Sequence, residues 1–145
     1  MPSAVLDTTV LVAAFLKPVK GGAAFELLAF AGDGAFDLYL SNQILDETTD
    51  VLLNRPRLRR RYQYPDSAVA DYCQGLGQLA VSVISDPQPV QVVRDPNDNM
   101  IVACALAAGA EYLVTRDDDL LSLGSHRSIA MIAPEAFLHV LRSAA

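Results

Sequence analysis

Two aspartates follow apolar runs of the sequence, at the points where strands of a sheet would end. Asp7 comes directly after the run at 3–6 (SAVL), and Asp117 follows the run at 112–115 (YLVT). In an open parallel sheet, ligands bind in the crevice outside the carboxyl ends of the strands. We therefore expect both carboxylates to face one crevice, although aspartate is also common at such places as a simple helix cap.

Two further acids lie on predicted helices. Glu47 borders the apolar stripe of a helix expected over 42–53, and Asp98 falls in the first turn of a helix that Asp95 would cap. Each has an ordinary structural explanation on its own. A glutamate at the rim of a stripe can extend into water, and an acid in a first turn interacts favourably with the helix dipole.

If the four acids lie close together in the fold, they could form a metal-binding site. Clustered carboxylates repel one another, and their pKa values rise unless a cation or basic groups neutralise them. Oxygen ligands of this kind suit Mg²⁺, or Mn²⁺ as a substitute. Such an ion lowers the pKa of water and stabilises charge on a phosphodiester transition state. The pattern therefore indicates metal-dependent hydrolysis of phosphodiesters.

Positive charge is concentrated in one short segment. The chain carries a net charge of −6, which by itself argues against a nucleic-acid partner. The segment 54–62 (NRPRLRRRY) contains no acid and five arginines: Arg55, Arg57, Arg59, Arg60 and Arg61. Removing these five charges from −6 leaves −11 on the rest of the chain. This segregation suits a protein that holds a cation beside a polyanion, the alternative being a solvated helix end without a partner.

The elements that would position these residues alternate between short β-branched runs and longer helical ones. This alternation predicts an α/β fold, a three-layer α/β/α sandwich with a mostly parallel central sheet. Strands are expected at 3–6, 36–40, 80–84, 112–115 and 129–132, with a further extended run at 90–93. Helices are expected at 10–16, 22–30, 42–53, 65–79, 95–108, 117–122 and 134–141, and the arginine segment is interrupted by Pro56.

Length and composition narrow the class of protein. At 145 residues, one domain over 1–145 is expected. Cys73 and Cys104 are isolated, which argues against a disulfide framework or a structural zinc site. The first positive charge is Lys17, so the N-terminus lacks the basic start of a secretion signal, and no apolar window is long enough to cross a membrane. We expect a cytoplasmic protein without a membrane partner.

Four short motifs occur in order along nearly the whole chain: VLDTTVL at 5–11, the segment 40–52 that contains Glu47, RDPND at 94–98 before a helix of small residues, and LVTRDDDLL at 113–121. In their order and spacing they resemble the PIN-domain ribonucleases. Among these, the chain is most similar to the single-domain toxin-like proteins of prokaryotic toxin–antitoxin pairs.

The resemblance implies roles for particular residues. The metal-binding and catalytic carboxylates would be Asp7, Glu47, Asp98 and Asp117. Asp119 matches a further acid often found in the family's site, and Thr115 a hydroxyl residue beside it. Thr9 stands where the family usually has asparagine, and threonine lacks the second donor and the reach of the amide.

The implied function is that of a Mg²⁺-dependent endoribonuclease, the toxin of a toxin–antitoxin pair. RNA would be the substrate, an antitoxin protein the inhibitor, and a homodimer or higher homo-oligomer the usual state. The five arginines would guide the RNA backbone or contact acidic residues of the antitoxin.

Two other functions remain open from the sequence. A haloacid-dehalogenase-like phosphatase also begins with a strand-end aspartate, but it needs a second aspartate where Thr9 stands. A degenerate PIN-like module could bind RNA or a partner without cutting. Cleavage of RNA, release of phosphate from monoesters, or binding alone would separate the three.

Overall fold

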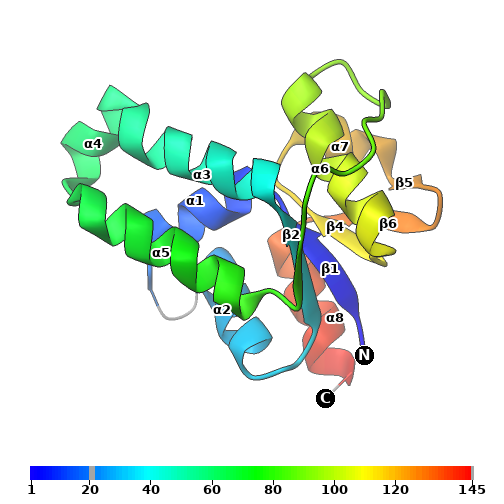
Figure 1. Ribbon diagram of the computed structural model, residues 1–145. Coiled ribbons are helices and arrows are strands. Elements are labelled where there is room, and N and C mark those ends of the chain that lie inside the picture. Colours follow the sequence, from blue (N-terminus) through cyan, green and yellow to red (C-terminus); the bar gives the residue numbers. More distant parts are fainter. Residues whose placement is uncertain (20–21, 145) are drawn as a thin grey trace.

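The computed structural model describes residues 1–19 and 22–144, and a six-stranded sheet forms the centre of that part (Figure 1). The strand order is β3-β2-β1-β4-β6-β5. The strands are β1 (Ser3–Leu6), β2 (Asp37–Ser41), β3 (Ser82–Ile84), β4 (Tyr112–Val114), β5 (Ser125–His126) and β6 (Ile129–Ile132). All neighbours are parallel except β5, which is antiparallel to β6. The predicted α/β fold with a mostly parallel sheet is confirmed.

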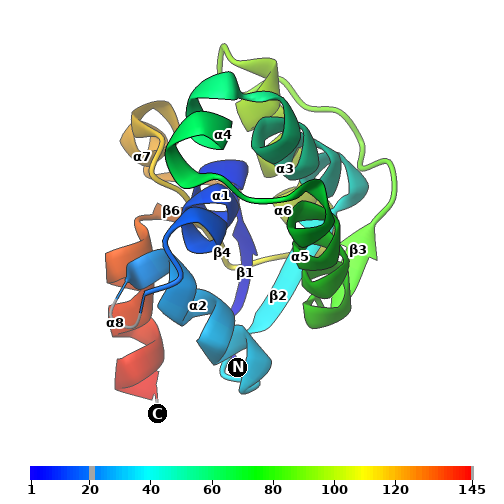
Figure 2. The same cartoon turned by 90° about the vertical axis from the view of Figure 1, so that its left-hand side faces the viewer.

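Helices cover both faces of this sheet. They are α1 (Thr8–Leu16), α2 (Ala23–Gly32), α3 (Asn42–Asn54), α4 (Pro56–Tyr62), α5 (Asp66–Leu79), α6 (Pro96–Ala108), α7 (Asp118–Leu123) and α8 (Pro134–Ala144). Helix α6 packs against β1 to β4, and Figure 2 shows α1 and α2 in front of the strands with α6 behind them. In the described part of the chain, no helix combines the length and apolar character needed to span a bilayer.

Polar residues at the strand ends determine where several helices begin. The Asp7 carboxylate accepts a hydrogen bond from the Val10 N–H (3.1 Å), and the Ser41 hydroxyl accepts one from the Ile44 N–H (3.1 Å). Such bonds satisfy amide groups that the first turn of a helix leaves unpaired. The capping residues of α1, α3, α6 and α7 are Asp7, Ser41, Asp95 and Asp117. Two of the predicted site acids thus also start helices.

The core lies between the sheet and its helices. Leu6, Leu40 and Leu113 on neighbouring strands are completely buried, as are Leu52 on α3 and Phe137 on α8. Complete burial of such side chains contributes about 1.5–3 kcal/mol each. This packing holds the carboxyl ends of the strands in a fixed arrangement.

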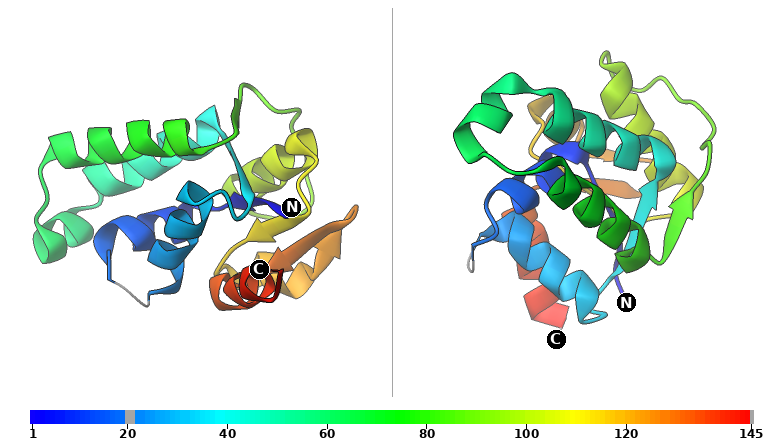
Figure 3. Two further views of the ribbon diagram at one scale, coloured as in Figure 1. Left: turned by 90° about the horizontal axis from the view of Figure 1, so that it is seen from below. Right: turned by 60° about the vertical axis from the view of Figure 1, so that its left-hand side comes forward.

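Helices α3 and α5 lie side by side and extend away from the sheet, with α4 joining them at the far end (Figures 1 and 3). The predicted interruption at Pro56 coincides with the break between α3, which ends at Asn54, and α4. The helix that follows was not predicted: Pro56 is its first residue, where its missing N–H would have had no partner in the helix. The segment from 57 to 62 is therefore helical.

Two other local predictions differ from the structure. Residues 90–93 form no strand, because the N–H groups of Val92 and Val93 donate to the side chain of Asn99 (2.8 and 2.9 Å) rather than to a neighbouring strand. Strand β5 was not predicted, since a pair of residues gives no alternating pattern to detect.

Candidate metal centre

The candidate site lies where the direction of strand addition reverses. The chain adds β2 and β3 on one side of β1, and later β4 and β6 on the other. Leu6 of β1 pairs in register with Val114 of β4, and the Asp7 N–H donates to the Val114 carbonyl (3.1 Å). Asp7 and Thr115 therefore follow two adjacent strands at the same edge. Reversal points of this kind are where open α/β sheets bind their ligands.

Asp7 is buried and fully engaged by hydrogen bonds. One carboxylate oxygen accepts from the Thr9 hydroxyl (2.6 Å) and from the Val10 N–H (3.1 Å), and the other accepts from the Thr115 hydroxyl. The Thr115 hydroxyl in turn accepts from the Asp117 N–H (2.9 Å). Burial raises the pKa of Asp7, these three hydrogen bonds oppose the rise, and the charge of Asp117 adds to it.

Glu47 approaches the same place from α3. Its carboxylate accepts a hydrogen bond from the Thr8 hydroxyl (3.2 Å), which fixes it beside the start of α1. Partial burial raises the pKa of Glu47, and the charges of Asp7 and Asp95 raise it further. The Thr8 hydrogen bond and the charge of Arg55 act in the opposite direction.

Three other carboxylates form a tight group. Each of Asp98, Asp117 and Asp119 offers an oxygen, and the three oxygens lie within 4.8 Å of one another. Asp98 is 8% exposed, and its Oδ2 has no hydrogen-bond partner in the part of the chain that the structure describes. Asp117 uses one oxygen to cap α7, accepting from the Asp119 N–H (2.9 Å). The group therefore brings three carboxylate oxygens close together, and its Asp98 has a buried oxygen without a donor.

The pKa of Asp98 reflects both its burial and the repulsion between these carboxylates. Burial raises the pKa of Asp98 to about 6, with further contributions from the charges of Asp117, Asp95, Asp7 and Asp119. Arg116, which directly precedes Asp117 in the sequence, does not relieve this repulsion. Arg116 makes a two-armed ion pair with Glu135 on α8 (2.7 and 3.2 Å). Within the described residues, no basic side chain forms an ion pair with Asp98, Asp117 or Asp119.

A divalent cation fits these residues. An unpartnered buried carboxylate oxygen is costly, because the group has lost its water without gaining a donor. A hard cation at the common point of Asp98, Asp117 and Asp119 would supply that missing partner and cancel the repulsion that raises the pKa of Asp98. Carboxylate-only donor sets of this type favour Mg²⁺ or Mn²⁺ over zinc, which prefers nitrogen and sulfur.

The seven acids and threonines assigned to the site from the sequence do not all lie in one group. The structure brings Asp98, Asp117 and Asp119 into one potential ligand group, and it places Thr9 and Thr115 as hydrogen-bond donors to Asp7. Asp7 and Glu47 lie within electrostatic range of each other, and Asp7 also of Asp98, but neither belongs to the group of three.

Sequence reasoning missed two contributors. Thr8 was passed over, although it supplies the hydrogen bond to Glu47, and Asp95 was assigned only a capping role, although its charge raises the pKa of Asp98. The run Asp7-Thr8-Thr9 could have indicated the role of Thr8, since a hydroxyl residue next to a strand-end acid lies close to the same site as that acid.

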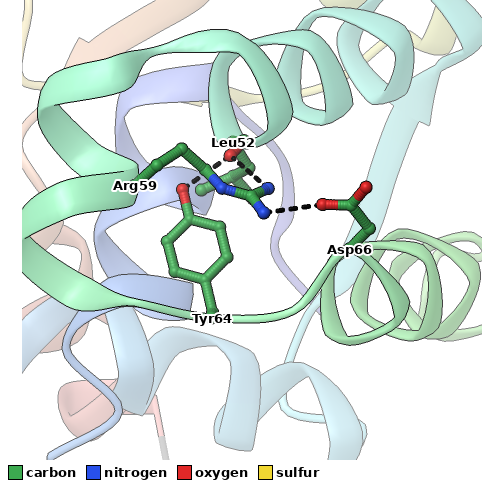
Figure 4. Close-up of polar contacts among 4 residues, drawn as sticks. All are labelled: Leu52, Arg59, Tyr64 and Asp66. Atoms are coloured by element: carbon green, nitrogen blue, oxygen red, sulfur yellow. Dashed lines mark hydrogen bonds and ion pairs between the residues drawn. The ribbon is translucent and has the colours of Figure 1, made fainter.

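The five arginines of the basic segment do not share one environment. Arg59 is partly buried and held by three contacts: it pairs with Asp66 (2.6 Å), donates to the Leu52 carbonyl (3.5 Å) and lies over the Tyr64 ring at 4.8 Å (Figure 4). Tyr64 donates to the same carbonyl (2.6 Å), so the two side chains together provide donors for this carbonyl in the last turn of α3.

The other four arginines are exposed: Arg55, Arg57, Arg60 and Arg61. Arg61 lies over the Tyr62 ring at 5.5 Å. Arg55 differs from the rest because its charge lowers the pKa of Glu47, which places it beside the acidic site.

A groove of about 370 Å³ leads away from the acids between α1 and α3. We call it the α1–α3 groove. Thr8, Thr9 and Glu47 line it at the acidic end, and Lys17 and Arg55 are its cations. Its apolar lining is provided by Val12, Ala13, Leu16, Val51 and Leu58, together with the ring of Tyr62.

Comparison with known proteins agrees with this arrangement. Residues 3–119 match the PIN domain family, so the chain belongs to the PIN domain family. A search of curated protein sequences found no match.

The fold is similar to that of a chain in the crystal structure of VapBC2 from Rickettsia felis bound to a DNA fragment from their promoter. The TM-score is 0.58 at 13% sequence identity, over 89% of this chain and 96% of that one. At this identity the likeness concerns the fold, which is that of a PIN domain.

Proposed function

We propose that this protein is a Mg²⁺-dependent endoribonuclease and the toxin of a toxin–antitoxin pair, formed by one domain over 1–145 in the cytoplasm. The observation that carries the proposal is the buried, unpartnered oxygen of Asp98 in a group of three carboxylates at the reversal point of the sheet. Membership of the PIN family makes a nuclease the natural activity for such a group.

Each residue has a distinct part in the proposed reaction. Asp98, Asp117 and Asp119 would hold the cation, with Asp7 and Glu47 facing the same space. The cation, when bound, would supply charge stabilisation for the phosphodiester and lower the pKa of water. Thr9 and Thr115 fix the Asp7 carboxylate, so that it does not have to reorganise when the substrate binds. Glu47, whose pKa is raised by burial, would exchange a proton with a water molecule in this space.

A variant set tests this activity directly. We expect the wild-type protein to cut mixed single-stranded RNA when Mg²⁺ is added, and Asp98→Asn to lose that cutting while remaining folded. Asp71→Asn is the matched control, because Asp71 is an exposed acid on α5 outside the site. RNA binding without cutting would favour the non-catalytic module, and phosphate release from small monoesters would favour the phosphatase.

The exposed arginines are proposed to guide the RNA backbone toward the acids. Replacing Arg57 and Arg60 by alanine should reduce the slope of log affinity against log salt by about 2, since each phosphate contact contributes about 1. Arg127 and Arg142 provide the control pair, as they are exposed and far along the chain from the basic segment. An unchanged slope in the Arg57/Arg60 variant would refute this role.

An antitoxin is the proposed inhibitory partner. The neighbour in fold was solved as part of VapBC2, and the α1–α3 groove of this chain offers an apolar lining with Lys17 and Arg55 for an acidic, partly apolar segment. A bound segment there would cover Thr9 and Glu47 and so close the site. A homodimer is proposed as the working state, and light scattering of the purified protein measures it.

A further inference from the structure

A second and larger cavity lies beside the acids but contains none of them. It measures about 580 Å³ and is bounded by the first two turns of α6, the start of α3 and the segment 87–94. We call it the α6 pocket. Neither the metal group nor the α1–α3 groove uses its lining.

The wall of the α6 pocket is preformed. The Asn99 side chain accepts hydrogen bonds from the Val92 and Val93 N–H groups (2.8 and 2.9 Å) and donates to the Val93 carbonyl (2.8 Å). Asn99 is 9% exposed, so this clamp is shielded from water. Pro87 and Pro89 further restrict the backbone of the same segment. The pocket therefore keeps its shape without a ligand.

The lining combines apolar surfaces with two available polar groups. Pro87, Pro89 and Met100 give apolar faces, and Gln43 and Arg94 bring an amide and a guanidinium. Within residues 1–19 and 22–144, neither of these two side chains makes a hydrogen bond or ion pair, and both are exposed. An amide with free donor and acceptor next to flat apolar surfaces is suited to the edge and face of a nucleobase.

The pocket is adjacent to the acids on two helices. Pro96 and Asn99, which line it, flank Asp98 in the first turn of α6. Gln43 precedes Glu47 by one turn on the same face of α3, an axial distance of about 6 Å. A phosphodiester at the acids would place its neighbouring nucleotide at the mouth of this pocket.

We propose that the α6 pocket binds one unpaired base of the RNA strand, next to the phosphodiester that is cut. Gln43 hydrogen-bonds the edge of the base, the apolar wall contacts its face, and Arg94 pairs with the flanking phosphate. The base must be unstacked to enter, so the pocket selects single-stranded RNA and gives the cut a base preference. This inference rests on the proposed nuclease function. The cation Arg94 beside an acidic site favours a polyanion over a peptide as the occupant.

The test uses single-stranded oligoribonucleotides with one cut site. For the wild type in Mg²⁺, an abasic nucleotide at one position next to the cut should slow cleavage about 10-fold, as expected for the loss of one base contact. Gln43→Ala should make the rates for the four bases at that position nearly equal. Gln74→Ala, an exposed glutamine on α5 outside both cavities, should keep the wild-type preference.

Arg94→Ala should raise KM about 10-fold for every base without changing the preference, because a phosphate contact carries no sequence information. Arg142→Ala is its control. Cleavage that is equally fast with all four bases and with the abasic nucleotide, and unchanged in Gln43→Ala, would overturn the pocket proposal and leave the nuclease function intact.

Absence of cleavage by the wild type would instead contradict the nuclease function. The fluorescence anisotropy of the same labelled oligonucleotides then tests the pocket proposal separately. An affinity that depends on the base, with this dependence lost in Gln43→Ala, supports the proposal, and an affinity independent of the base overturns it. Pocket variants that alter binding of a proline-rich peptide but not of RNA would also overturn it and indicate a protein partner.

Discussion

The two halves of the acidic site differ in how their carboxylates are satisfied. In the half around the end of β1 and the start of α1, the Asp7 carboxylate receives three hydrogen bonds, and Glu47, which reaches this half from α3, receives one from Thr8. In the half formed by α6 and α7, Asp98 has an oxygen with no partner within the described residues, and three carboxylates converge. The first half is already organised within the protein, whereas the second half lacks a partner.

This difference indicates separate tasks. A carboxylate that is fixed by donors before any ligand arrives contributes direction and charge without reorganising. A carboxylate group that is crowded and unpaired gains most from a cation, because binding removes both the repulsion and the desolvation cost. We therefore expect substitutions in the α6–α7 half to abolish metal binding, and those in the β1–α1 half to weaken catalysis while metal binding remains.

The largest effect is expected for Asp98→Asn. Mutating a residue that only orients a metal ligand lowers metal affinity or activity about 10–100-fold. Loss of the ligand itself should have a larger effect, so the rate of RNA cleavage should fall at least about 100-fold. Isothermal titration with Mn²⁺ should show no binding to the variant. Normal metal affinity in Asp98→Asn would contradict the assignment of the α6–α7 half.

Thr115→Val is expected to have the next largest effect. It removes a hydrogen bond to buried Asp7 and the acceptor for the Asp117 N–H. Hydrogen bonds to charged groups contribute about 1.5–3 kcal/mol, so kcat should drop roughly 10- to 100-fold. Thr115→Ser, which retains the hydroxyl, should restore most of the rate, and a Mn²⁺ titration should detect near-normal affinity in both variants.

Thr9→Val should cost less, about 10-fold in kcat, because exposed Thr9 supplies only one of the three bonds to Asp7. Thr9→Asn introduces the residue usual in the family and should keep a rate close to wild type. A loss in Thr9→Asn as large as in Thr9→Val would show that the hydroxyl, rather than any donor, is required.

Adding Mg²⁺ should stabilise the folded protein. At a concentration 100 times the Kd, binding adds about 2.7 kcal/mol, which corresponds to a rise in Tm of about 5–10 °C for a chain of this size. Thermal denaturation followed by circular dichroism measures it. Thr9→Val should show the same rise and Asp98→Asn none; equal rises in both variants would remove the distinction between the halves.

The smallest effect is on stability as a function of pH in the absence of metal. Since the folded protein raises the pKa of Asp98 to about 6 from the usual 3.8, it binds a proton more readily than the unfolded chain does. The free energy of unfolding should therefore increase as the pH falls from 7 toward 5. Urea denaturation should show a flatter profile for Asp98→Asn, and an identical profile would contradict the raised pKa.

Much of the fold followed from local pattern. Strand β6 at 129–132 and helix α5 from 66 to 79 were predicted closely, because apolar alternation and Pro65-Asp66 are local signals. The position of Asp7 at a strand end was predicted for the same reason. Residues 90–93 were predicted wrongly as extended, because their hydrogen bonds depend on Asn99, a residue of the following helix.

The arginine segment shows a second limit of prediction from local sequence. Its composition indicated five equivalent charges, yet Arg59 is bound to Asp66, Leu52 and Tyr64 while Arg57 and Arg60 are exposed. Which arginine contacts the neighbouring elements depends on how α4 is placed where it joins α3 and α5. No property of the segment alone distinguishes the five.

The sequence by itself determined the class of fold, the order of its elements and the acids at their ends, because periodicity and capping act over a few residues. Only the tertiary structure decided which carboxylate oxygens have a partner, which arginine is held in the fold, and that a pocket lies between α6, α3 and the segment 87–94. These features join residues from distant parts of the chain, such as Asp7 and Thr115, and their distances depend on strand order and register. Local pattern contains no information about either.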